Sequence, residues 1–189
     1  MGRAVWILTR AKPFQHLPTI IMQDSAKTRV TLREASATDA AALSEIAWNA
    51  KRSWGYSDEL MRLWKAELTI SSELLSARKT ATRKTIVRRT IVAEIQGQPV
   101  AFAALELTER SAEIDNMWVL PECQRCGIGR ALFQRLVQHA ASVGHRQVVI
   151  VADPHAAEFY ARLGAVHRGW EDSIPKGRKL PRFEYEIGL

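Results

Sequence analysis

A pair of glycines at a strand-to-helix junction restricts the fold of this chain more than any other feature. Gly127 and Gly129 lie in the stretch PECQRCGIGRAL, after an apolar strand-like segment (111–120) and at the start of a helix-like one (129–143). A glycine in the first turn of a helix costs about 1 kcal/mol relative to alanine. Such a cost is understandable where a ligand approaches the backbone, because the first N–H groups of a helix lack internal partners and bind anions. The junction therefore indicates a pyrophosphate site.

The same stretch contains a Cys-x-x-Cys pair, Cys123 and Cys126, which allows two other interpretations. A structural zinc site needs four ligands, and the chain has two cysteines and scattered histidines, so we expect no metal. A dithiol redox function stays an alternative, because thiols at the start of a helix are often acidic. It does not account for the glycines, however, and we favour the anion site.

Size and composition indicate a single soluble domain. The chain has 189 residues, 47% of them hydrophobic and 25% charged, and no apolar run approaches the roughly 20 residues of a membrane span. The apolar patch at the amino terminus is short and is followed by basic residues, so we expect no signal peptide. With two cysteines and no secretion signal, we expect a cytoplasmic protein with reduced thiols and no membrane partner.

The net charge of +7 is concentrated in a few segments. Residues 78–89 hold six basic residues and residues 176–182 hold four, and neither segment contains an acid. We expect both segments to be loops. Charge that is gathered in this way favours local contacts with anions over a continuous nucleic-acid-binding stripe. No nucleic-acid partner is therefore expected.

Periodicity divides the chain into an N-terminal extension, 1–28, which is a candidate for disorder, and one domain, 29–189. Alternating apolar residues predict strands, and apolar residues on one helical face predict helices. Strands first follow one another and then alternate with helices, which favours an α/β fold with a mixed sheet flanked by helices. The predicted strands cover 29–35, 90–95, 100–107, 111–120, 147–152 and 182–187, and the predicted helices begin at Asp39, Ser57, Gly129 and Asp153.

Two motifs carry a resemblance to a known family. The stretch DNMWVLPECQRCGIGRAL resembles the acetyl-CoA-binding signature of the GCN5-related N-acetyltransferase (GNAT) superfamily, Gln/Arg-x-x-Gly-x-Gly/Ala, through Gln124, Gly127 and Gly129. The later stretch DPHAAEFYARLGA is similar to a second family segment, and RVTLREASATDAAAL to the family's opening strand and helix. The resemblance covers residues 29–189. It implies a mixed, mostly antiparallel sheet of six to seven strands, splayed between the fourth and fifth, with the cofactor in the gap.

The resemblance also implies how acetyl-CoA, the acyl donor, is held. Backbone N–H groups of residues 125–130 would bind its pyrophosphate, and main-chain groups of Met117 and Val119 its pantetheine arm, with the Val119 amide polarising the thioester carbonyl. Asp153 stands where relatives have an asparagine that contacts the cofactor, and we expect it to cap a short helix instead. The predicted cofactor-binding residues are Met117, Trp118, Val119, Gln124, Arg125, Cys126, Gly127, Ile128, Gly129, Arg130, Asp153 and Phe159.

Acyl transfer to an amine needs a proton donor for the departing thiolate and a base for the amine. Tyr160 matches the family's general acid. Relatives often place a glutamate at the position of Glu113, so we predict Glu113 as the base, with Asp115 second. Simple strand alternation predicts that both carboxylates share a face with Met117 and Val119.

The acceptor is expected to be a primary amine of a small molecule or peptide. Trp54 and Tyr56 lie in a region that lines the acceptor site in relatives, and we predict that they contribute to its wall. The basic segments suggest an acidic acceptor, with Arg178 and Lys179 at a positive mouth. A non-catalytic acyl-CoA sensor on the same fold is the other alternative, and a homodimer is left open.

Overall fold

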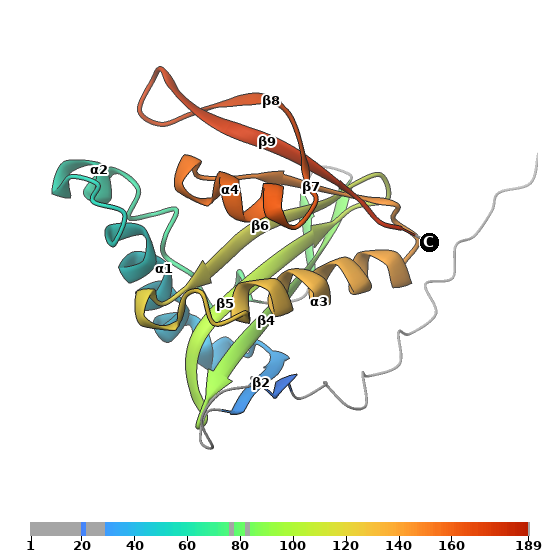
Figure 1. Ribbon diagram of the computed structural model, residues 1–189, viewed down its shortest axis with the longest axis horizontal. Helices are drawn as coiled ribbons and strands as arrows, with labels where there is room; N and C mark the ends of the chain where they lie inside the picture. Colours follow the sequence, from blue (N-terminus) through green and yellow to red (C-terminus); the bar gives the residue numbers. More distant parts are fainter. Residues whose placement is uncertain (1–19, 22–28, 76–77, 82–83, 189) are drawn as a thin grey trace, which may run out of the picture.

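The described strands form one mixed sheet with helices on both faces (Figure 1). A computed structural model describes residues 20–21, 29–75, 78–81 and 84–188. Most of the expected extension, 1–28, lies outside these residues; within it, Ile20 and Ile21 pair with Val30 and Arg29.

The six predicted strands and four predicted helices occur in the predicted order, and the strands at 20–21, 78–81 and 166–173 are additional. The strands are β1 (Ile20–Ile21), β2 (Arg29–Glu34), β3 (Arg78–Ala81), β4 (Lys84–Ile95), β5 (Gln98–Leu107), β6 (Ala112–Val119), β7 (Gln147–Val151), β8 (Val166–Ser173) and β9 (Arg178–Glu186). The α-helices are α1 (Ala40–Arg52), α2 (Asp58–Leu63), α3 (Ile128–Ser142) and α4 (Ala157–Arg162), and the 3-10 turns are η1 (Ala37–Asp39), η2 (Pro121–Cys123) and η3 (Pro154–Ala156). The strand order in the sheet is β1-β2-β4-β5-β6-β7-β9-β8, with β3 paired to β4. Without the short β1 and β3, seven strands remain, as the resemblance implies.

The basic segments do not form the loops expected from their charge. Residues 78–89 fall largely in the antiparallel hairpin of β3 and β4, and residues 178–182 begin β9. The run Thr85-Ile86-Val87 explains the first difference, because β-branched residues favour extended backbone whatever charges flank them. Charge alone was therefore a poor guide to local structure in these segments.

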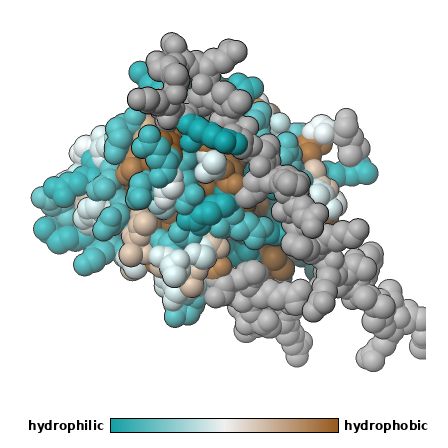
Figure 2. Space-filling model, turned by 90° about the horizontal axis from the view of Figure 1, so that it is seen from below, coloured by the Kyte–Doolittle hydropathy of each residue, from teal (hydrophilic) through white to brown (hydrophobic). Residues whose placement is uncertain are grey.

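Each face of the sheet has its own hydrophobic core, because successive strand residues point to opposite faces. Ala101 and Ala103 of β5 are fully buried in the cluster that also contains the apolar face of α3. Val92 and Phe102 point the other way, into the cluster formed by α1, α2 and Trp64. The surface seen in Figure 2 is mostly hydrophilic, with hydrophobic residues visible in small separate areas. None of the described helices has both the length and the apolarity to cross a membrane.

The sheet opens between β6 and β7, the fourth and fifth of the seven main strands. These strands are parallel, and their described register consists of two pairs, Glu113 with Val149 and Ile114 with Ile150. By contrast, β5 and β6 stay paired as far as Ala101 and Val119. The carboxyl-terminal part of β6 thus leaves its neighbour and has an open edge, which confirms the predicted splay.

A β-bulge in β6 corrects one expectation about the site. Ala104 pairs with Asn116 and Leu105 with Ile114, so that Asp115 is the extra residue. The extra residue reverses the alternation. Met117 packs with Ile114 in the α3-side core. The carboxylates of Glu113 and Asp115 therefore lie on the opposite face from Met117 and Val119, not on the same face as predicted.

Phe102 should be among the most costly core residues to truncate, because its ring is fully buried between the sheet and α1. We expect Phe102→Ala to lower the free energy of unfolding by about 3–5 kcal/mol, measured by urea denaturation. Val143→Ala is the control. Its side chain is half exposed, so it should change stability by less than about 0.5 kcal/mol.

Candidate active site

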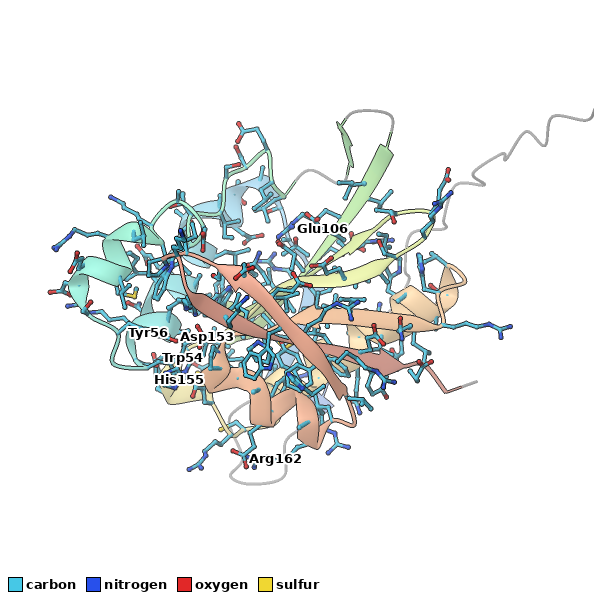
Figure 3. The ribbon with its side chains drawn as sticks, turned by 90° about the horizontal axis from the view of Figure 1, so that it is seen from above. Trp54, Tyr56, Glu106, Asp153, His155 and Arg162 are labelled. Atoms are coloured by element: carbon cyan, nitrogen blue, oxygen red, sulfur yellow. The ribbon has the colours of Figure 1, made fainter. Side chains whose placement is uncertain are left out.

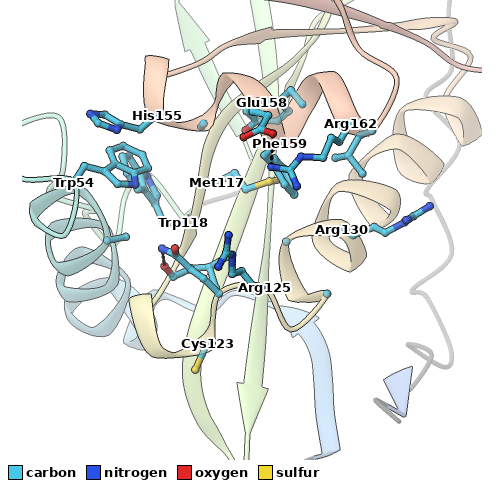
Figure 4. A pocket seen from close by; sticks show the side chains of 18 residues that line it. Trp54, Met117, Trp118, Cys123, Arg125, Arg130, His155, Glu158, Phe159 and Arg162 are labelled. Atoms are coloured by element: carbon cyan, nitrogen blue, oxygen red, sulfur yellow. Dashed lines mark hydrogen bonds and ion pairs between the residues drawn. The ribbon is translucent and has the colours of Figure 1, made fainter. Parts of the chain in front are cut away.

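A cavity of about 580 Å³ lies where the turn that contains Gly127 and Gly129, here called the glycine turn, meets the end of β6 and the start of α4 (Figure 4). It brings together most of the predicted cofactor residues and one predicted acceptor residue. Its walls include Trp54, Met117, Trp118, Val119, Gln124, Arg125, Gly127, Gly129, Arg130, Phe159 and Tyr160. Cys126, Ile128 and Asp153 are not among its lining residues, nor are Glu113, Asp115 and Tyr56. Ile128 is instead buried in the core beneath α3.

The glycine turn forms one end of this cavity and leads directly into α3. Gly127 is the residue before the helix and has φ +80°, a left-handed conformation that costs a residue with a Cβ roughly 1–2 kcal/mol. Arg125 also has positive φ, at +62°. At Gly129 a Cβ would lie 3.3 Å from the Phe159 ring. The glycines thus provide the tight turn and the bare backbone that a bound pyrophosphate needs at a helix N-terminus.

The edge of β6 supplies main-chain groups to the cavity. The Leu120 N–H donates to the Val100 carbonyl over 3.0 Å, which makes these residues a hydrogen-bonded pair of the antiparallel ladder. Because such pairs alternate along a ladder, Val119 and Met117 direct their main-chain groups away from β5 and toward the gap. The Val119 carbonyl accepts a hydrogen bond from Gln124 Nε2 at 3.2 Å. The N–H groups of Val119 and Met117 therefore face the space where a pantetheine arm would lie.

Tyr160 lines the cavity from α4 while the rest of its ring is buried. Phe159 and Phe133 pack against it with ring centroids 5.1 and 6.2 Å away. Burial raises the pKa of the Tyr160 phenol above its ordinary value, so the hydroxyl keeps its proton at neutral pH. The phenol is thus protonated and lines the cavity, as a proton donor must be, and burial makes it a weaker acid than a phenol in water.

The two candidate bases differ in their surroundings. Asp115 Oδ2 lies 2.5 Å from Nη1 of Arg88, and the same guanidinium is 2.6 Å from Glu106. Partial burial is the main cause that raises the pKa of Glu113, and the nearby carboxylates of Glu171, Asp115 and Glu106 raise it further. A carboxylate with a raised pKa is the better proton acceptor, whereas Asp115 is held in an ion pair. The comparison favours Glu113, on the face of β6 opposite α3.

Asp153 caps η3, as expected, because its Oδ1 accepts the His155 N–H at 3.1 Å. Its two oxygens also bind Lys51, Tyr56 and Arg178. Tyr56 therefore points at this carboxylate rather than into the cavity. The expectation that Arg178 lies at a positive mouth is wrong, because its side chain is 15% exposed and turned inward. Lys179 instead pairs with the exposed Asp172. The two cations do not form the predicted positive mouth together.

Several residues of the site were not predicted. His155 stacks on the predicted residue Trp54 with a centroid distance of 5.4 Å, and Trp118 of β6, also predicted, lies 5.6 Å from the same ring. Arg162 and Glu158, an ion pair at 2.7 Å on α4, also line the cavity. Their neighbours in the stretch DPHAAEFYAR were singled out, so the spacing of a helix that starts at Asp153 was the signal for them. Among the described residues no group of three potential metal ligands was found.

The comparisons with known proteins agree with this geometry. A family model described as the acetyltransferase (GNAT) family matches residues 41–165, so the chain belongs to this family. An uncharacterized N-acetyltransferase of Methanocaldococcus jannaschii is 36% identical over 93 residues, which cover 42% of this chain and 41% of that protein. The chain thus spans about two fifths of the length of that curated relative. The expected family is confirmed.

Solved structures support the fold. A GCN5-related N-acetyltransferase from Rhodopseudomonas palustris has a TM-score of 0.67 at 22% identity, over 89% of this chain and 99% of that one. The PaiA N-acetyltransferase from Thermoplasma acidophilum, solved with coenzyme A, has a TM-score of 0.63 at 17% identity, over 83% and 98%. The predicted fold is confirmed, and the family agrees with N-acetyltransferase as the enzyme class and acetyl-CoA as the donor.

Gly129→Val should weaken binding of acetyl-CoA at least tenfold, about 1.4 kcal/mol, because its side chain would meet Phe159 beside the glycine turn. Calorimetry on the folded variant measures this loss. Gly144→Ala is the control: it strains a glycine with φ +95° at the far end of α3, away from the cavity. Its affinity should match that of the unchanged protein. Equal affinities in all three proteins would remove the glycine turn from the binding site.

Proposed function

We propose that this protein is an N-acetyltransferase that transfers the acetyl group of acetyl-CoA directly to a primary amine of a small molecule or peptide. The observation that carries the proposal is the single cavity shared by the glycine turn, the open edge of β6 and Tyr160. Acetyl-CoA supplies the acetyl group as an activated thioester. The turn before α3 suits its pyrophosphate, and the gap between β6 and β7 suits its extended arm.

Four groups of this chain divide the chemistry. The N–H groups at the start of α3 bind the phosphates, and those of Met117 and Val119 hold the arm and polarise the carbonyl. Glu113 takes the proton of the amine, directly or through a water, from the face of the sheet opposite α3. Tyr160 donates a proton to the leaving sulfur. The bulge at Asp115 accounts for how acid and base approach from opposite faces of one strand.

The acceptor enters this scheme from the side of α1 and α2. Trp54, Trp118 and His155 line that end of the cavity and form a continuous aromatic wall (Figure 4). The charge of the acceptor stays a prediction. Arg88 and Arg178, which the sequence offered as anion-binding groups, are buried in ion pairs with acidic side chains of this chain. An acidic acceptor therefore has less support from the geometry than from the sequence.

The two alternatives have less support. A non-catalytic sensor has no need for a buried phenol on the wall of the cavity or for a carboxylate on β6 whose pKa is raised by burial. A dithiol enzyme needs an acidic thiol, whereas burial, together with Glu122 and Cys126, raises the pKa of Cys123. We therefore regard the cysteines as incidental to the chemistry.

Tyr160→Phe should lower kcat by about 10²- to 10⁴-fold, the usual contribution of a general acid, with little effect on the affinity for acetyl-CoA. The ring still packs on Phe133 and Phe159, and the proton donor alone is lost. Rapid-quench measurement of the chemical step, with an amine that proves active, gives the rate. An unchanged chemical step would exclude Tyr160 as the acid.

Glu113→Gln should change the pH dependence. A base must be deprotonated to act, and the pKa of Glu113 is raised, so activity should fall as the pH drops through a value above the ordinary glutamate range. The variant should lose that acid limb together with most of its rate. Asp115→Asn is the comparison and should keep the limb, since Asp115 is engaged by Arg88. The pH profile of kcat/KM distinguishes the two, and an unchanged limb in Glu113→Gln would contradict the assignment.

A further inference from the structure

The open sheet creates a mechanical problem at the acceptor end of the cavity. The sheet consists of two halves, one that carries β6 and one that carries β7. Beyond the two register pairs of these strands, the ladder no longer joins the halves. On the α3 side, packing of Phe133 on Tyr160 and Tyr185 connects the halves. The other face needs a connection of its own, because the width of the gap there decides whether the arm of the donor fits.

Asp153 lies where that connection is made. It lies two residues after the end of β7, and its side chain is 6% exposed. From the other half, Lys51 of α1 donates to Oδ2 at 3.0 Å, and the Tyr56 hydroxyl donates to Oδ1 at 2.9 Å. From β9, Arg178 Nη2 donates to Oδ2 at 2.6 Å. One carboxylate thus binds groups from α1, from the segment between α1 and α2, and from β9.

The surroundings of this carboxylate make the connection strong. Lys51 and Arg178 are 8% and 15% exposed, so both cations share one buried anion. The Trp64 ring contacts both cations, with its centroid 4.3 Å from the lysine ammonium and 4.6 Å from the guanidinium. Its indole N–H donates to the Ile174 carbonyl at 2.7 Å, a further bond between the halves. Charge-assisted hydrogen bonds in a site with little water are stronger than those at the surface.

The carboxylate also controls the neighbouring wall. Its bond to the His155 N–H fixes the turn that begins η3 and leads into α4, which carries Phe159 and Tyr160. Tyr56 packs edge-on against the His155 ring at 5.3 Å. Figure 3 shows Trp54, Tyr56, Asp153 and His155 gathered at one end of the molecule, well away from Glu106. The position of the proposed acid is thus coupled to the same side chain.

We propose that Asp153 is a positioning residue, an ionic clamp that ties α1 and β9 to the end of β7 and so sets the width of the gap for the acyl donor. This role rests on the proposed function in one respect, namely that the acyl donor binds in the gap. It explains the aspartate at this position, because an asparagine would leave Lys51 and Arg178 buried without an anion. The oxygens of Asp153 are engaged within the chain rather than by the cofactor.

The test uses the full chain and coenzyme A as the probe. Asp153→Asn should weaken coenzyme A binding at least tenfold by calorimetry. In the ligand-free protein, amide hydrogen exchange over residues 154–163 should accelerate at least tenfold. Asp172→Asn is the matched control, since it breaks an ion pair of similar length, 2.7 Å, on the exposed surface of β8. It should change neither quantity.

A second variant keeps the test decisive if Asp153→Asn fails to fold. Lys51→Met combined with Asp153→Asn removes one of the two unmatched cations and the clamp together, and it should fold better than the single variant. Slow exchange and normal coenzyme A affinity in this folded double variant would overturn the clamp, even if its melting temperature were lower. Failure of the unchanged protein to bind coenzyme A would instead overturn the proposed function, so the two outcomes are distinct.

Discussion

The separation of β6 from β7 is the constraint on which the rest of this structure depends. Two parallel strands that share two register pairs leave the main chain of Met117 and Val119 facing a gap rather than a neighbour. Main-chain donors without a hydrogen-bond partner are costly inside a protein unless a ligand or water binds them. The glycine turn, the N-terminus of α3 and the cavity all lie at this gap, because it is where the fold leaves main-chain groups for a ligand.

Packing of two cores then stabilises a sheet that its own hydrogen bonds leave divided. The small side chains of Ala101 and Ala103 allow α3 to lie close to β5, while Phe102 fills the space under α1 on the opposite face. The polar cluster at Asp153 works across the gap rather than beneath a helix. Apolar contacts therefore determine which helices cover the sheet, and directional polar contacts determine how far apart its two halves stand.

Much of this arrangement could be predicted from local sequence. Most strands and helices follow from apolar periodicity, with the hairpin of β3 and β4 as an exception, and the turn at Gln96-Gly97 has the left-handed residues that such a hairpin favours. The glycine turn could be predicted because its signal is local in the chain. The Asp153 cluster could not, since Lys51 and Arg178 come from segments 102 and 25 residues away. The bulge at Asp115 shifts the apolar residues of β6 from even positions (Ala112, Ile114) to odd ones (Met117, Val119), but the apolar Trp118 between the last two hides this change of phase.

That bulge has a consequence for how such a site can diversify. Residues 112–114 and residues 116–119 belong to one strand, but the extra residue between them, Asp115, separates their environments. A substitution before the bulge alters the polar face around Glu113 and Glu106, and leaves the main-chain groups of Val119 in place. Selection for a new amine can therefore act on one end of β6 while the donor-holding end is preserved. One inserted residue thus gives a single strand two surfaces that can vary independently.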